Sequence, residues 1–382
     1  MSGRVVLALA PGALRRLTAG KDVVLVSGTN GKTTTTRLIA EMLTEVGRVA
    51  SNDTGANMPA GLVTAMISER RFDYAVLEVD ERYLRTVCRQ TAPKVVVLLN
   101  LSRDQLDRNP ETAQVARSWR EMSHEVRTTV VANCDDPQIY WAASSFPAVT
   151  WVAAGTAWPH DSWCCPSCGA SLSRVADLGH WSCQGCTLAR PRPHWRLGTR
   201  SVTFTPEKTT FALKVALPGR ANLANAAMAL AAATSLGHAP ELMARRLERV
   251  RSIAGRYEVV RFLGRRVRLL LAKNPASWGE TFETISTSAA VLIVLNARVL
   301  DGRDTSWIWD VDFRELRGQA VYISGERRHD LAVRLDIADV EFKIVSSLEE
   351  ACRLAPLGQL DMVANYTAFL DLVRELRSGR QT

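Results

Sequence analysis

A short glycine-bounded segment near the start of the chain has the residue types that bind phosphate. It consists of Gly28, Thr29, Asn30, Gly31, Lys32, Thr33 and Thr34. Backbone N–H groups of such a turn cradle phosphates, the lysine neutralises their charge, and a threonine hydroxyl can reach Mg²⁺. The spacing Gly-x-x-Gly-Lys-Thr is about two residues shorter than the common phosphate-loop pattern. We therefore predict an ATP site in which Thr33 is a magnesium ligand.

A carboxylate farther along the chain is suited to the same metal ion. The apolar segment 72–77 predicts a strand, and it runs directly into Glu78, Val79, Asp80 and Glu81. Carboxylates at the carboxyl end of a strand in an ATP-binding α/β sheet can hold Mg²⁺ directly or through water. We expect Glu78 to be a magnesium ligand with a catalytic role, and a solvated acidic turn is the alternative.

Four of the eight cysteines form two Cys-x-x-Cys pairs about fifteen residues apart. The pairs are Cys165 with Cys168 and Cys183 with Cys186. Four thiolates close a tetrahedral shell around Zn²⁺ and leave no open position for catalysis. Disulfides are the alternative, which an intracellular location disfavours. We predict a structural zinc ribbon inserted at about residues 160–190.

The elements that must position these groups alternate between apolar strands and helices. Strands are expected at 23–26, 72–77, 95–99 and 128–132, each followed by polar residues. This alternation predicts a doubly wound parallel sheet with function gathered at the strand ends. The length of 382 residues suits two domains, which we place at 1–250 and 251–382.

The charge of the chain is +9, with basic clusters at 245–251 and 264–268. A solvated basic surface is the simplest explanation, and an anionic membrane, anionic substrates or nucleic acid are alternatives. No basic stripe interleaved with aromatic residues supports nucleic-acid binding. No signal peptide or membrane-spanning stretch is evident, so we expect a cytoplasmic location.

Four motifs, in this order along the chain, resemble those of the Mur ligases. They are the phosphate segment, Asn133-x-Asp135-Asp136-Pro137, Gly219-Arg220-x-Asn222-x-x-Asn225-Ala226 and Gly255-Arg256-x-Glu258. Mur ligases join amino acids to the peptidoglycan stem through an acyl phosphate, at the expense of ATP. The resemblance implies that Asn222, Asn225 and Arg256 contact ATP. From the residues alone, the two asparagines could bind a base or ribose, or cap their helix.

Three departures from the common Mur pattern look like those of the MurT group. The phosphate loop begins early, the four cysteines are present, and the later segments are Lys273-Asn274-Pro275 and 301–313. The resemblance implies a Mur-type central domain with an inserted ribbon, and a smaller α/β C-terminal domain. It further implies ATP-dependent amidation of the D-glutamate α-carboxyl of lipid II in peptidoglycan biosynthesis. Ammonia would come from a GatD-type glutaminase in a heterodimer, at the inner face of the membrane.

The resemblance also implies that an aspartate of the C-terminal domain supports the Cys-His pair of the glutaminase. Asp310 is our first choice and Asp304 our second, and the alternative is that both cap turns around buried Trp307 and Trp309. Lys273 follows an apolar strand and is expected to contact phosphate or the acyl phosphate. An ordinary lysine at a strand end is an equal alternative.

Two other functions are compatible with these residues. One is a stand-alone Mur-like ligase that adds an amino acid without a glutaminase. The other is a non-catalytic scaffold that binds ATP and zinc. A scaffold need not keep phosphate and metal ligands together, so the joint presence of Lys32, Thr33, Glu78 and Asp104 argues against it.

Overall fold

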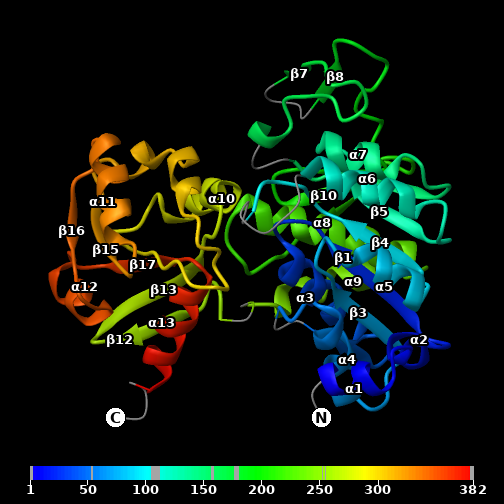
Figure 1. The fold of residues 1–382 in the computed structure, drawn as a ribbon, viewed down its shortest axis with the longest axis horizontal. Coiled ribbons are helices and arrows are strands. Elements are labelled where there is room, and N and C mark those ends of the chain that lie inside the picture. The colour runs from blue at the N-terminus through cyan, green and yellow to red at the C-terminus, as the bar shows by residue number, and fades with distance from the viewer. Residues whose placement is uncertain are drawn as a thin grey trace. The chain divides into compact units, whose positions relative to one another are not determined.

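The chain is described by a computed structural model, which forms two compact units (Figure 1). The described residues are 3–52, 55–104, 112–155, 159–175, 180–251, 253 and 255–378. The larger unit comprises residues 1–102 and 110–254, and the smaller unit comprises 103–109 and 255–382.

The larger unit is built on a nine-stranded sheet in the order β11-β10-β9-β6-β5-β4-β1-β3-β2. Its strands are β1 (Asp22–Ser27), β2 (Val49–Ser51), β3 (Tyr74–Glu78), β4 (Val95–Leu98), β5 (Thr129–Asn133), β6 (Val149–Ala153), β9 (Trp195–Leu197), β10 (Ser201–Phe204) and β11 (Thr209–Ala212). Neighbouring strands from β2 to β9 are parallel, which confirms the predicted parallel sheet. Strands β10 and β11 add an antiparallel hairpin at one edge, which the sequence did not predict.

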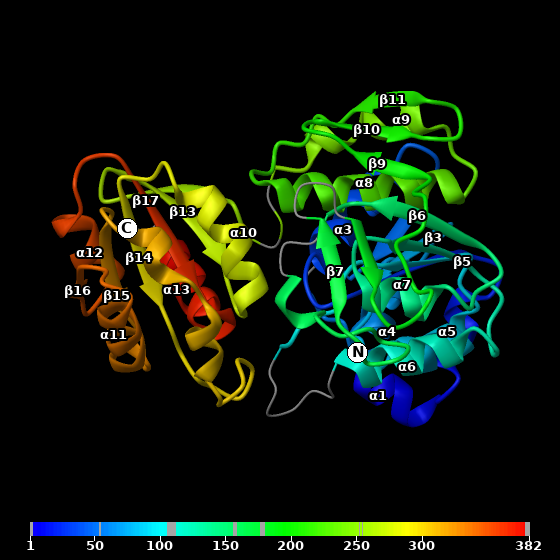
Figure 2. The same ribbon diagram turned by 90° about the horizontal axis from the view of Figure 1, so that it is seen from above.

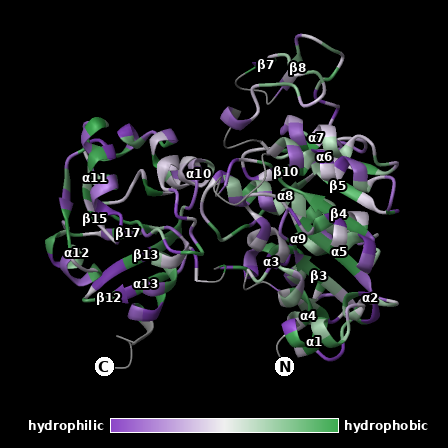
Figure 3. Ribbon diagram, in the orientation of Figure 1, coloured by the Kyte–Doolittle hydropathy of each residue, from purple (hydrophilic) through white to green (hydrophobic). Residues whose placement is uncertain are grey.

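Helices cover both faces of this sheet. One face is covered by α3 (Lys32–Leu43), α8 (Arg220–Ser235) and α9 (Pro240–Ala244), and the other by α1 (Gly3–Leu9), α2 (Ala13–Thr18), α4 (Pro59–Ser68), α5 (Leu84–Thr91), α6 (Thr112–Met122) and α7 (Pro137–Ala143). The central strands are therefore buried on both sides, which explains their continuous runs of valine and leucine. Figure 3 shows the same strands as a hydrophobic centre.

The cysteine-rich segment forms a small ribbon on the larger unit. It holds the 3₁₀ turn η1 (Pro159–Asp161) and an antiparallel pair of strands, β7 (Leu172–Val175) and β8 (His180–Cys183). The indole N–H of Trp181 donates to the carbonyl of Cys134 at 3.0 Å, and the ring lies edge-on to Tyr140 of α7. The ribbon is thus docked on the turn between β5 and α7.

The smaller unit has a six-stranded sheet in the order β12-β13-β17-β14-β15-β16, in which only β12 is antiparallel to its neighbour. The strands are β12 (Val259–Phe262), β13 (Arg265–Leu271), β14 (Ala290–Val294), β15 (Ala320–Ser324), β16 (Phe342–Ile344) and β17 (Gln359–Ala364). Two separate apolar clusters lie on its two faces. One includes residues of α10 (Pro275–Ile285) and α11 (Arg328–Ile337), and the other includes residues of α12 (Leu348–Leu354) and α13 (Tyr366–Ser378). Among the described helices of the chain, none has the length and apolar character needed to cross a membrane.

Candidate active site

The phosphate-type loop lies where β1 ends and α3 begins. Gly31 precedes the first helical residue, Lys32, and has a φ of +83°. A glycine at this position has no side chain to satisfy the free N–H groups of the first helical turn. These groups and the helix dipole therefore form a site that favours an anion.

Hydrogen bonds from the end of β4 hold the loop in shape. The Asn30 N–H donates to Oδ1 of Asn100 at 2.9 Å, and the Asn100 amide donates to the Asn30 carbonyl at 3.1 Å. The Thr29 hydroxyl donates to the Ser102 carbonyl at 3.1 Å and accepts from the Ser102 N–H at 3.0 Å. These bonds anchor the loop to the residues that end and follow β4, and so order it for phosphate. Asn100 is one of the polar residues that follow the strand expected at 95–99, and its bonds to the loop were not predicted.

Lys32 is held under the loop by its own chain. Its ammonium donates to the carbonyls of Gly28 and Thr29, and its Nζ lies 3.3 Å from the Glu81 carboxylate. The side chains of Lys32 and Glu81 are only 8% and 18% exposed, so little water screens this ion pair. Sequence reasoning missed the role of Glu81, because the pairing depends on how the β3 end turns toward the loop.

Glu78 lies at the end of β3, in register with Val26 of β1. Its side chain is buried, and Oε1 accepts from the Asn57 amide at 3.3 Å. The other oxygen, Oε2, has no hydrogen-bond donor among the described residues. A buried carboxylate oxygen without a donor is costly unless a cation completes it. This donor set fits Mg²⁺, and the hydroxyl of Thr33 in the first turn of α3 would supply a second oxygen ligand.

The three residues assigned to ATP by resemblance lie in different surroundings. Asn225 on α8 is beside the loop, where its Oδ1 accepts from Thr35 at 3.3 Å and faces Gly31. Asn222 is buried and donates to the Pro218 carbonyl at 2.5 Å, a bond that does not cap α8, whose N-cap residue is Gly219. Arg256 belongs to the smaller unit and is half-buried there.

The four paired cysteines are brought together as expected. Their sulfur atoms all lie within 4.8 Å of one another, and the distances Cys165–Cys186 and Cys168–Cys183 are 3.7 and 3.4 Å. A tetrahedral Zn²⁺ with Zn–S bonds of about 2.3 Å requires sulfur separations of about 3.8 Å. The cluster therefore fits a structural zinc ion, with all four positions filled by protein.

In the smaller unit, Lys273 directs its ammonium to the Asp104 carboxylate, with which it forms an ion pair. Its own N–H donates to the Ser277 hydroxyl at 2.9 Å, at the start of α10. Asn274 caps that helix through the Ser277 N–H. The strand end thus fixes the backbone at Lys273 and leaves the ion pair to orient its side chain.

Of the two candidate aspartates, Asp304 lies just before η3, a 3₁₀ helix over Ser306–Asp310, and Asp310 is its last residue. Asp304 accepts from the Ser306 N–H at 2.8 Å, and this bond keeps the pKa of Asp304 below its ordinary value. The carboxyl of Asp310 lies 3.3 Å from the Arg103 guanidinium. Both side chains are exposed, but within the described part of the chain only Asp310 of the two has a cationic side chain at ion-pair distance.

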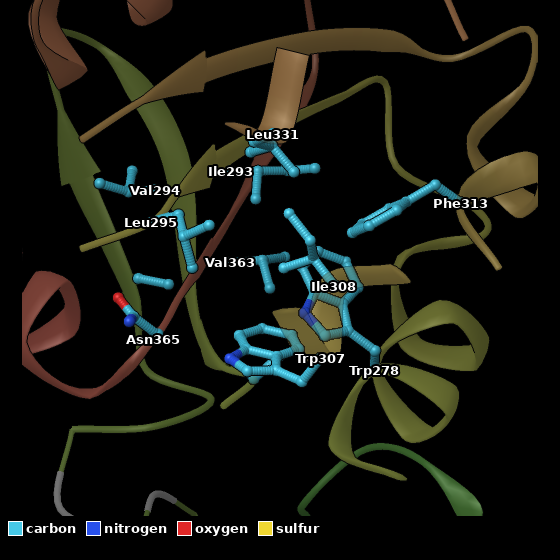
Figure 4. Close-up of a pocket in the computed structure, with 12 residues that line it drawn as sticks. Trp278, Ile293, Val294, Leu295, Trp307, Ile308, Phe313, Leu331, Val363 and Asn365 are labelled. Atoms are coloured by element: carbon cyan, nitrogen blue, oxygen red, sulfur yellow. The ribbon is translucent and has the colours of Figure 1, made fainter. Parts of the chain in front are cut away.

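The packing of η3 corrects one expectation. Trp307 and Ile308 line a small apolar pocket, together with Trp278, Phe313 and Val363 (Figure 4). The alternative account of the aspartates had both tryptophans buried, but the side chain of Trp309 is 51% exposed. Successive residues of a 3₁₀ helix point about 120° apart, so one of these neighbours must face outward. The centroid of the Trp309 ring lies 5.7 Å from the Arg334 guanidinium.

Comparison with known proteins agrees with this architecture. Residues 26–162 match the Mur ligase middle domain, and residues 271–369 match the MurT ligase C-terminal domain. The lipid II isoglutaminyl synthase (glutamine-hydrolyzing) subunit MurT of Streptococcus pneumoniae is 31% identical over 100% of this chain and 92% of that protein. The subunit of the same name from Staphylococcus aureus is 29% identical over 93% of this chain and 87% of that protein.

Solved structures of lower identity share the fold. A pseudomurein peptide ligase type C from Methanothermus fervidus has a TM-score of 0.73 at 18% identity, covering 94% of this chain and 79% of that one. The MurF ligase of Thermotoga maritima, solved in complex with ADP, has a TM-score of 0.68 at 16% identity, covering 97% and 83%.

The parallel sheet, its phosphate-type loop and the matched domains define a protein of the Mur ligase class. Within that class, the identity over the whole chain and the matched C-terminal domain are decisive. The chain belongs to the MurT family.

Proposed function

We propose that this chain is the synthetase subunit of a lipid II isoglutaminyl synthase. It uses ATP to amidate the α-carboxyl of D-glutamate in the stem peptide of lipid II. The observation that carries the proposal is the 31% identity to a MurT subunit over the whole chain, in a protein whose phosphate loop is preformed. The chain acts in the cytoplasm, where the lipid-linked substrate presents its peptide at the inner membrane face.

The chemistry follows from the low reactivity of a carboxylate toward ammonia. Transfer of the γ-phosphoryl group of ATP to the carboxylate oxygen gives an acyl phosphate, whose phosphate is a good leaving group. Lys32 and the N–H groups of α3 stabilise the charge on the transferring group. Thr33 and Glu78 would hold Mg²⁺, and the ion would neutralise phosphate charge there. Ammonia then attacks the acyl carbon, the C–N bond forms, and phosphate leaves.

The ammonia comes from a glutaminase partner of the GatD type. A glutaminase needs a reactive thiolate, and three isolated cysteines of this chain are buried. Burial raises the pKa of Cys134 to about 12 and that of Cys352 to about 11, and it raises the pKa of Cys88 as well. None of the three suits nucleophilic attack near neutral pH, so the hydrolysis of glutamine is assigned to the partner.

One aspartate of the η3 segment supports the catalytic histidine of that partner. The task needs an exposed carboxylate that is ionised and not already neutralised. Asp310 was the first choice from the sequence, but Arg103 lies beside it. Asp304 is ionised through its bond to the Ser306 N–H, and we now rank it first.

The test is amidation of lipid II by this chain with glutamine, ATP and a candidate glutaminase, each omitted in turn. Product should require this chain, glutamine, ATP and the glutaminase. Lys32→Ala should abolish product formation, whereas Lys343→Ala on the exposed β16 should not. ATP turnover stimulated by an amino acid without a partner would move the assignment to a stand-alone ligase. Full activity of Lys32→Ala would instead favour the non-catalytic scaffold.

A further inference from the structure

Almost all of the net charge of the chain comes from one stretch of sequence. Residues 190–251 contain eleven lysines and arginines and three glutamates, a net charge of +8 out of the total of +9. The rest of the chain is therefore close to neutral, at +1. Such a distribution creates a local positive field, whereas an evenly spread excess would not.

The fold gathers this stretch at one edge of the larger unit. It forms β9, β10, β11, α8 and α9, and then the 3₁₀ turn η2 (Leu247–Arg249). Within that unit, Figure 2 shows β9, β10, β11 and α9 together at the end away from α1. Helix α8 is buried and has no charge beyond Arg220, its first residue, so the other basic side chains lie on β9 and on the loops and turns of this edge.

A groove at this edge collects three of the cations. Arg200, Lys214 and Arg251 line an open space of about 1060 Å³, with Glu248 as its one acidic residue. All four of these residues are exposed. After β11 the chain alternates, so that Ala212, Lys214 and Ala216 face outward while Leu213 and Val215 are buried. The groove therefore offers cations beside small apolar side chains.

The cations of the groove differ from other basic residues of the same stretch. Arg190 is paired with Asp135, and Arg246 with Glu45. Arg200, Lys214 and Arg251 have no carboxylate within ion-pair distance among the described residues. Their charge is thus available to an external anion.

We infer that this basic edge, defined by Arg200, Lys214 and Arg251, binds the acidic phospholipid headgroups of a membrane surface. The inference rests on the proposed function, because a lipid-linked substrate is met only at a bilayer. Anionic bilayers attract basic side chains near their surface, by about fivefold in binding for each one. Nucleic acid is disfavoured because no aromatic side chain lines the groove for stacking on bases.

The experiment measures co-sedimentation of the full chain and its glutaminase with lipid vesicles. One set is phosphatidylcholine alone, and the other adds phosphatidylglycerol. Binding should require phosphatidylglycerol and weaken as salt is raised. The triple variant Arg200→Gln, Lys214→Gln, Arg251→Gln should lose on the order of a hundredfold in vesicle binding.

A matched control removes the same charge elsewhere on the larger unit. Arg15, Arg16 and Arg71 are exposed, and their replacement by glutamine should change vesicle binding by no more than a few-fold. Equal losses in the two triple variants would overturn the inference, because net charge alone would then explain binding. The protein could also bind neutral vesicles that contain lipid II as well as it binds acidic vesicles, and lose that binding in the Arg200 triple variant. This result would overturn the inference in favour of recognition of the substrate diphosphate. Binding of a duplex oligonucleotide but not of vesicles would overturn it in favour of nucleic acid.

Amidation assays separate this inference from the proposed function. With detergent-solubilised lipid II, the Arg200 triple variant should amidate as well as the unmodified protein. With lipid II in acidic vesicles at subsaturating concentration, the amidation rate of this variant should fall by the same factor as its vesicle binding. Absence of amidation in both formats, for the unmodified protein too, would refute the proposed function and leave the vesicle-binding result to stand alone.

Discussion

Replacement of Gly31 by alanine tests whether the phosphate loop is shaped by the backbone and by α8 together. Gly31 has a φ of +83°, a conformation that costs an L-residue about 1–2 kcal/mol. A methyl group there would also meet the amide of Asn225, with the Asn225 Cγ only 3.1 Å from the new Cβ. Crowding of this kind costs about 1–3 kcal/mol when a neighbour must move. We therefore expect Gly31→Ala to destabilise the larger unit by about 2–5 kcal/mol.

A second substitution separates the two costs. Asn225→Ala removes the group that the methyl would strike, at the loss of one hydrogen bond of 3.3 Å from Thr35. That loss is worth about 0.5–1.5 kcal/mol and is partly offset by the higher helix propensity of alanine. In the double variant only the backbone cost and this small term are left. The coupling energy should therefore be about 1–3 kcal/mol in favour of the double variant.

Urea unfolding followed by tryptophan fluorescence provides the measurement. Because the chain has two units, the transition to analyse is the one that ATP shifts in the unmodified protein. Gly20→Ala is a useful control, since Gly20 also has a positive φ but has no neighbour within 4 Å of a new Cβ. It should reproduce the backbone cost alone. A coupling energy near zero would refute the steric argument, and a loss below about 0.5 kcal/mol in Gly31→Ala would refute both parts.

Three further predictions concern charge and metal. Glu81→Gln should bind ATP about two- to fivefold more tightly in an equilibrium titration, because Lys32 then has no ion pair to break before it contacts phosphate. Weaker binding would instead make Glu81 part of the metal site. Asp304→Asn should reduce glutamine hydrolysis by the complex by at least about a hundredfold, while ammonium-dependent amidation persists. Asp312→Asn should not reduce glutamine hydrolysis, because Arg314 already neutralises Asp312. A larger loss in Asp310→Asn than in Asp304→Asn would reverse our ranking. The purified chain should contain about one zinc per molecule by elemental analysis, and Cys183→Ser should lower both zinc content and stability, whereas Cys164→Ser should lower neither.

The local parts of the site could be predicted from the sequence because their signals are local. The strand before Gly28, the helix after Lys32 and the two Cys-x-x-Cys pairs are each contiguous patterns of a few residues. The bonds that shape the loop are not local. Glu81 is 49 residues from its partner Lys32, and Ser102 is 73 residues from Thr29. No periodicity in one segment indicates which polar residue of another segment will accept a given hydrogen bond.

Elements with weak patterns were missed for a different reason. Strands β10 and β11 have four residues each and include several threonines, so they lack the apolar run that marked the central strands. They are stabilised by the edge of a sheet that exists only after folding. The alternative that placed Trp309 in a buried turn relied on the high average burial of tryptophan, which does not settle a single position. The position of the basic edge needed the same tertiary information, since the charge clusters alone did not show which side chains are neutralised.

The ribbon and the nucleotide loop are joined through one turn, which explains how a closed metal site can matter to an ATP-dependent enzyme. Trp181 of the ribbon donates to the carbonyl of Cys134, and Asp136, two residues farther on, accepts from the Leu101 N–H at 2.9 Å. Leu101 precedes Ser102, which binds the Thr29 hydroxyl of the loop. Four cysteine ligands leave zinc no catalytic position. A zinc ion held by these cysteines would therefore act by keeping Trp181 against this turn, and its loss would reach the loop only through Asp136 and Ser102.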